Sequence, residues 1–118
     1  MEEVGSAAII EAISTDINGI GYSGMGYKDS GVKIVPLSMN ENMPYVTASA
    51  KSAVSGEYPL ARFLYIYINK KPDQALSDLE KEFIKFLLSS EGQQLVIKDG
   101  YIALPDKVIT KILNDIDA

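Results

Sequence analysis

Residues 63–68 form the densest apolar run of the chain and read FLYIYI. Aromatic side chains occupy the odd positions and aliphatic side chains the even positions, and successive side chains of an extended backbone point to opposite faces. Aromatic and β-branched residues favour a strand. Because the run contains almost no polar residue, it predicts a strand buried on both faces, as in a sheet that helices cover on each side.

The segment after this run has the pattern of a capped amphipathic helix. Ser77 and Glu80 stand at the spacing of a capping box, in which the serine hydroxyl and the glutamate carboxylate each accept a hydrogen bond from the other residue's backbone N–H. Apolar residues then recur at helical spacing at positions 79, 83, 84, 86, 87 and 88. Ser90 and Gln93 repeat the capping spacing, so a second helix is expected over residues 91–98.

Three further helices and two short strands complete the predicted elements. Ser6 is the expected cap of the first of these helices, Gly56 ends the second, and Asp106 stands near the start of the last. The expected helices run from Ser6 to residues 15–18, over 47–55 and over 108–116, and the expected strands cover 19–22 and 32–35. The pattern predicts an α/β fold, a short mixed sheet with flanking helices in a single structural unit.

The composition narrows the classes of function. The chain has 118 residues, enough for one domain with a core, and its net charge of −5 disfavours nucleic acid as a partner. It has no cysteine and no histidine, which excludes thiol catalysis, Ser-His-Asp hydrolysis and histidine-ligated zinc within this chain. An enzyme would have to rely on carboxylates, lysine, tyrosine and serine, and a non-enzymatic protein without a cofactor is the favoured expectation. No apolar run reaches the ~20 residues of a membrane helix, and the acidic N-terminus is unlike a signal peptide.

Gly5, Ser6 and Arg62 are the candidates for contact with an anion. Gly5 and Ser6 precede a predicted helix, whose first backbone N–H groups suit an anion, although a simple helix cap is the plainer interpretation. Arg62 is the only arginine and could bind phosphate through two parallel hydrogen bonds, whereas a structural ion pair or hydrogen bond is the favoured alternative. The glycines at 21, 24 and 26 reverse the order of a dinucleotide-binding fingerprint, so they are interpreted as backbone accommodation.

Five sequence motifs, in order, resemble one family. They read GIGY at 19–22, YPLAR at 58–62, YIY at 65–67, FLLSSEGQ at 86–93 and GYIALP at 100–105. The order and spacing are similar to the C-terminal half of the phosphate-binding proteins of ABC importers, which have the type 2 periplasmic-binding-protein fold. Ala61 and Ala103 depart from the family pattern at positions that look structural. The resemblance implies that residues 1–35 are the tail of the second lobe and residues 36–118 the C-terminal part of the first lobe.

The resemblance also implies a function. It suggests a fragment of an extracytoplasmic receptor for inorganic phosphate, which delivers its ligand to the permease of an ABC importer at the membrane. The family's arginine and its SGT loop precede the matched region, so this chain alone is expected to bind phosphate weakly or not at all. The alternative is an association module that has lost solute binding, since a chain cut within a lobe exposes strand edges; a homodimer is then expected.

Overall fold

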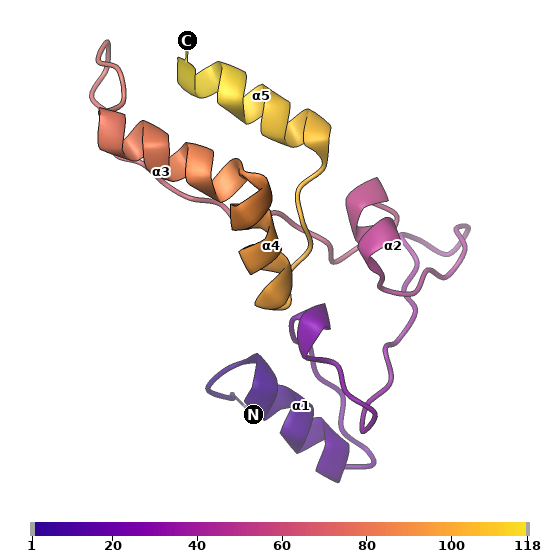
Figure 1. Ribbon diagram of the computed structural model, residues 1–118. Coiled ribbons are helices and arrows are strands. Elements are labelled where there is room, and N and C mark those ends of the chain that lie inside the picture. The colour runs from indigo at the N-terminus through magenta and orange to yellow at the C-terminus, as the bar shows by residue number, and fades with distance from the viewer. Residues whose placement is uncertain (1, 118) are drawn as a thin grey trace. The chain divides into compact units, whose positions relative to one another are not determined.

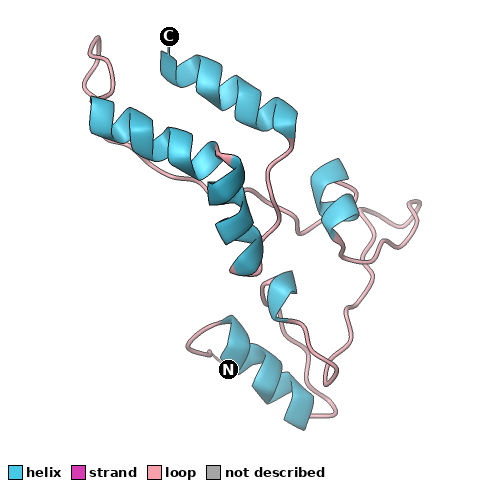
Figure 2. Ribbon diagram, in the orientation of Figure 1, coloured by secondary structure: helices cyan, strands magenta, loops and turns pink. Residues whose placement is uncertain are grey.

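The computed structural model describes residues 2–117, and helices are its regular elements (Figures 1 and 2). The α-helices are α1 (Ser6–Thr15), α2 (Ala50–Ser55), α3 (Asp78–Leu88), α4 (Ser90–Lys98) and α5 (Asp106–Asp117), with a 3-10 helix η1 (Met25–Tyr27). Internal contacts divide the chain into two units. The first unit runs to Ala61 and includes Asp99–Tyr101, and the second comprises Arg62–Lys98 and the chain from Ile102 onward.

The predicted sheet is not present between residues 2 and 117. Residues 19–22, 32–35 and 63–68 are loops, and Figure 2 shows no strand. The β-type pairing in this range is one antiparallel bridge, in which Leu37 and Val46 exchange N–H···O bonds of 2.9 and 2.8 Å. A strand needs a neighbouring strand to accept its hydrogen bonds. The prediction of a short mixed sheet is therefore wrong for this chain taken alone, because the apolar runs have no strand beside them.

Two aromatic side chains of the run at residues 63–68, those of Phe63 and Tyr65, contact each other. The ring centroids of Phe63 and Tyr65 lie 6.4 Å apart in an edge-to-face arrangement. Two residues of a strand rise by about 6.6 Å and place their side chains on the same face. The spacing of the two rings agrees with an extended backbone, whereas the predicted burial is wrong for the described chain, since Tyr65 and Tyr67 are exposed.

The capping box of α3 is confirmed. The Ser77 hydroxyl accepts from the Glu80 backbone N–H at 3.3 Å, and the Glu80 carboxylate accepts from the Ser77 N–H at 2.8 Å and from the Ser77 hydroxyl at 2.6 Å. Helix α3 contacts both α4 and α5 in the second unit. Its inner side carries Ile84, which is 8% exposed and is the buried apolar residue of the described chain. The helix is defined chiefly by local hydrogen bonds, because the surrounding core is small.

We expect the capping box to make α3 sensitive to acid. The hydroxyl and then the backbone N–H of Ser77 hold the pKa of Glu80 below its ordinary value of 4.5. A carboxyl group with a lowered pKa in the folded state stabilises that state above its unfolded pKa, and the contribution disappears as the pH falls through the lowered value. Helicity measured by circular dichroism should therefore fall in acid more steeply than in the non-titrating variant Glu80→Gln. The substitution Glu82→Gln, on the exposed face of the same helix, is the matched control, and equal acid sensitivity of both variants would contradict the prediction.

Helix α4 begins one residue earlier than predicted, and its cap is Ser89. The Ser89 hydroxyl accepts from the Gly92 N–H at 3.1 Å and donates to the Phe86 carbonyl at 2.7 Å, so one side chain ends α3 and starts α4. Gln93 is not the partner in a capping box. Its amide nitrogen donates to the Leu87 carbonyl and its amide oxygen accepts from the Leu104 N–H, each at 2.8 Å. The residues of the SSEGQ motif therefore join α3, α4 and the link that leads to α5.

Helix α2 in the first unit ends where the sequence predicts but begins later. Helix α2 begins after Ser49, whose hydroxyl accepts from the Ser52 N–H at 3.1 Å, while the Ser52 hydroxyl accepts from the Ser49 N–H at 2.9 Å. Gly56 ends the helix with a φ of 77°, a left-handed conformation that glycine adopts without steric cost. The predicted start at residue 47 was early, because the serine pair places the cap at Ser49 and the first helical residue at Ala50.

A close approach of two glycines connects residues 99–101 to η1 within the first unit. A Cβ atom added at Gly26 would overlap the carbonyl oxygen of Gly100 and would lie 2.6 Å from its carbonyl carbon. Gly100 itself has a φ of 88°, a backbone conformation that favours glycine. A Cβ atom at this position would meet its neighbours only at ordinary contact distances, so the conformation and not the lack of space requires a glycine here. The interpretation of Gly26 as backbone accommodation is confirmed, and its partner lies 74 positions away in the sequence.

Candidate functional site

The start of α1 presents backbone N–H groups that no side chain caps. Gly5 is the N-cap, with a φ of 147° and no side-chain cap hydrogen bond, and its carbonyl accepts from the Ile9 N–H at 3.1 Å. The backbone N–H groups of the first three helical residues, Ser6, Ala7 and Ala8, have no acceptor among the described residues. The first turn contains no acidic residue. An uncapped helix start of this kind can donate to an anion, because its N–H groups are free and the helix dipole is positive there.

Ser6 is the first residue of α1 rather than its cap, which corrects the prediction. Its hydroxyl oxygen accepts from the Gly24 N–H at 3.4 Å, and its carbonyl accepts from the Ser23 hydroxyl at 3.1 Å. A serine hydroxyl that accepts one hydrogen bond still has its own proton to donate. Residues 23 and 24 therefore hold Ser6 in place. No feature of the sequence predicted these two partners, which lie 17 and 18 positions away.

Arg62 opens the second unit, whereas Gly5 and Ser6 belong to the first. Its side chain is exposed, and it makes no hydrogen bond or ion pair with any residue between 2 and 117. The predicted structural ion pair is therefore not seen. The turn before it is ordered by backbone bonds, from the Tyr58 N–H to the Ser52 carbonyl at 3.1 Å and from the Ala61 N–H to the Tyr58 carbonyl at 3.2 Å. These bonds show that the YPLAR motif is a turn that leads into residues 63–68.

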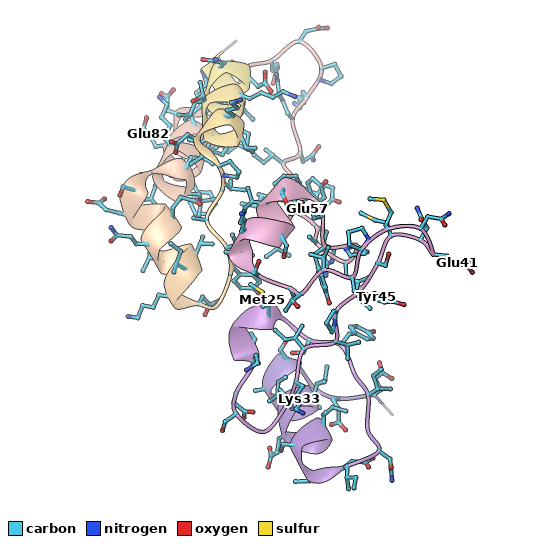
Figure 3. The ribbon with its side chains drawn as sticks, turned by 90° about the vertical axis from the view of Figure 1, so that its right-hand side faces the viewer. Met25, Lys33, Glu41, Tyr45, Glu57 and Glu82 are labelled. Carbon is cyan, nitrogen blue, oxygen red and sulfur yellow. The ribbon has the colours of Figure 1, made fainter. Side chains whose placement is uncertain are left out.

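A hollow of about 250 Å³ lies beside the loop that the Leu37 and Val46 bridge closes. Its lining is mostly apolar and comprises Met39, Met43, Pro44, Val46, Ser55, Gly56 and Glu57. Glu57 contributes a carboxylate, which also accepts from the Ser55 hydroxyl at 2.8 Å, and Glu41 projects from the outer tip of the loop (Figure 3). An apolar hollow with an acidic group disfavours phosphate, so this cavity is not the predicted anion site.

The described residues form neither a metal-binding cluster nor a membrane-spanning helix. Residues 2–117 contain no group of three or more acidic side chains placed to hold a metal ion. Within the same range, no helix is both long and apolar enough to cross a membrane.

The sequence profile of the PBP superfamily domain matches residues 3–91. The match covers most of the chain, and the chain therefore belongs to the PBP superfamily. Its fold is a partial domain of that superfamily, with helices and no sheet in the described range. This result confirms the predicted family of periplasmic-binding-protein folds.

Relatives with curated names agree with the resemblance. The chain is 48% identical over 115 residues to the phosphate-binding protein PstS of Pseudomonas aeruginosa PAO1, across 98% of this chain and 36% of that protein. It is 34% identical over 117 residues to PstS of Staphylococcus aureus RF122, across 94% of this chain and 34% of the relative. The chain thus spans about a third of the length of these relatives. They are binding proteins by name, which agrees with the prediction that the chain is not an enzyme.

Proposed function

We propose that this chain is part of a receptor for inorganic phosphate. The observation that carries the proposal is the 48% identity, over nearly the whole chain, to a protein named as phosphate-binding. The acidic net charge of −5 is compatible with this role, because neutral N–H and O–H donors can bind an oxyanion without a basic patch.

The proposed contribution of this chain to the ligand shell is the start of α1. Gly5 leaves the first turn without a side-chain cap, and Ser6 offers both a backbone N–H and a hydroxyl proton. Arg62 supplies a guanidinium group without a partner in the described chain, which suits an oxyanion or an acidic group of the complete receptor. The remaining phosphate ligands are proposed to come from the part of the receptor that this chain does not match.

The same proposal includes the lobe structure, the location and the partner of the complete receptor. The complete protein is proposed to have two lobes, with residues 1–35 in the second lobe and residues 36–118 in the first, and a mixed sheet that forms in the whole fold. It is proposed to act outside the cytoplasm and to pass phosphate to the membrane permease of an ABC importer, without a cofactor. These assignments rest on the relationship to the PstS proteins.

A chimera tests the proposal directly. The chimera is the Pseudomonas relative with its matching 115-residue part replaced by this chain. We expect calorimetry to show that the folded chimera binds phosphate in preference to sulfate and that this chain alone gives no binding heat. A folded chimera that does not bind phosphate, or that binds sulfate equally well, would overturn the proposed function.

Two substitutions of Ser6 in the chimera separate its donors. Proline is tolerated at the first helical position, so Ser6→Pro removes the N–H and the hydroxyl while α1 is kept. Ser6→Ala removes only the hydroxyl. Hydrogen bonds to charged groups contribute about 1.5–3 kcal/mol, so we expect the phosphate Kd to rise about tenfold in the alanine variant and about a hundredfold in the proline variant. The control is Ser14→Ala at the far end of α1, where the serine hydroxyl donates to the Glu11 carbonyl; equal effects at both positions would contradict the assignment.

The alternative function is an association module, and one observation favours it. The apolar residues 63–68 are exposed in this chain, as at a surface that takes a partner. On this alternative the chain forms a homodimer in solution and the chimera binds no phosphate. Light scattering that gives a monomer at all concentrations tested would exclude it.

A further inference from the structure

Met39 and Met43 expose their thioether side chains on one loop of the first unit. Met39 is 55% exposed and Met43 is 51% exposed, and both line the hollow of about 250 Å³ beside the end of α2. The third methionine of the described chain, Met25, lies in η1 and is half-buried. The oxidation of methionine follows its exposure. Among residues 2–117, the two loop methionines are therefore the thioethers most accessible to an oxidant.

The loop that carries these methionines is shaped by its own hydrogen bonds. Leu37 and Val46 exchange N–H···O bonds of 2.9 and 2.8 Å at its base. Above the base, the Ser38 hydroxyl donates to the carbonyls of Asn40 and Met43 at 2.6 and 2.8 Å. Every one of these partners belongs to the loop itself. The shape of the loop is therefore set locally and needs no strand or helix from a distant part of the chain.

The hollow offers no free side-chain donor to a polar group. Among the described residues of its lining, the side-chain donor is the Ser55 hydroxyl, which already donates to the Glu57 carboxylate at 2.8 Å. An ionised carboxylate only accepts hydrogen bonds. Oxidation converts the apolar thioether of methionine into a polar sulfoxide. A sulfoxide oxygen in the hollow would face a carboxylate without a donor, and a polar group removed from water without a partner is unfavourable.

We propose that Met39 and Met43 are a reversible oxidation site whose oxidant is a peroxide. The thioether sulfur attacks one peroxide oxygen, the O–O bond breaks and the S–O bond of the sulfoxide forms. The proton of the transferred oxygen passes to the departing oxygen, which leaves as water or an alcohol. Sulfur thus gives up one electron pair and the peroxide is reduced. The polar product loosens the contact between the loop and the end of α2. The inference rests on this loop and not on phosphate binding.

Peptide mapping by tandem mass spectrometry tests the site of oxidation. This chain and the chimera are treated with dilute hydrogen peroxide, in buffer and in urea. In buffer we expect Met39 and Met43 to be oxidised about tenfold faster than Met25 in both proteins, and in urea the three rates should converge. Equal rates in the native chain would overturn the assignment. Slow oxidation of both loop methionines in the folded chimera would show that the complete receptor covers them and would also overturn it.

Hydrogen–deuterium exchange tests whether oxidation opens the hollow. The Val46 amide donates to the Leu37 carbonyl at 2.8 Å and reports on the base of the loop. We expect peroxide to raise its exchange rate about tenfold, and treatment with the two methionine sulfoxide reductases, one for each epimer, to restore it. An oxidised chain whose Val46 amide exchanges at the original rate would contradict the opening of the hollow.

The double variant Met39→Leu and Met43→Leu is the matched control. Leucine keeps the apolar character and about the volume of methionine, but it has no sulfur to oxidise. Peroxide should therefore leave the exchange of the Val46 amide unchanged in this variant. An equal rise in the variant and in the parent chain would assign the effect to another residue and would overturn the proposed role of the two loop methionines.

Discussion

Gly26→Ala is expected to destabilise the chimera by about 3 kcal/mol. The added Cβ would overlap the Gly100 carbonyl oxygen and lie 2.6 Å from the carbonyl carbon. Both obstructing atoms belong to the backbone and cannot rotate away, so residues 99–101 would have to move off η1. The free energy of unfolding, measured by guanidinium denaturation of the chimera, reports this loss.

Gly24→Ala is the matched control for this prediction. A Cβ at Gly24 would meet the ring of Tyr27 at 3.3 Å, and a side chain can shift by the few tenths of an ångström required. We expect a loss of under about 1 kcal/mol in that variant. Equal losses in the two alanine variants would contradict the close approach of Gly26 and Gly100.

The second large effect is expected at the junction of α3 and α4. A Cβ at Gly92 would overlap the carbonyl oxygen of Phe86 and lie 2.7 Å from that of Leu87. Those carbonyls accept the Ser89 N–H at 3.0 Å and the Gln93 amide at 2.8 Å, so Gly92→Ala would disturb the end of α3 and the link to α5 together. We expect a loss of about 3 kcal/mol in the unfolding free energy of the chimera, with reduced helicity.

The exposed residue Gln94 offers the control at this junction. Gln94→Ala lies two positions further along the same helix, and alanine is the strongest helix former. Its unfolding free energy should stay within about 0.5 kcal/mol of the parent chimera. A loss in Gly92→Ala no greater than in this control would show that the helix junction relaxes around the added methyl group.

Local patterns were predictable because their causes lie within a few residues. The Ser77 and Glu80 capping box closes over three positions, and the left-handed glycine that ends α2 is fixed by its own backbone angle. The exact cap was less predictable where serines are adjacent. The Ser89 hydroxyl, and not that of Ser90, caps α4, and the N-cap of α1 is Gly5 and not Ser6, so each helix begins one residue earlier than predicted.

Features set by distant partners could not be derived from spacing. The strand prediction for residues 63–68 depended on neighbouring strands, and no segment between residues 2 and 117 pairs with the run. The hydrogen bonds of Ser6 to residues 23 and 24, and that of Gln93 to Leu104, join positions 11 to 18 residues apart. The resemblance identified the family from the motifs, and the structure then showed that Ser89, Gly92 and Gln93 serve helix packing.

The contact of Gly26 with Gly100 affects the order in which parts of the chain can fold during synthesis on the ribosome. The first unit is discontinuous, because it needs Asp99–Tyr101 in addition to the residues before Arg62. Synthesis at about 5–20 residues per second separates glycines that lie 74 positions apart by several seconds. Contacts close in sequence, such as those of α3 with α4, can form during that interval. Helix α1 is therefore made before residues 99–101, and its unit is completed only after α3 and α4 have been synthesised.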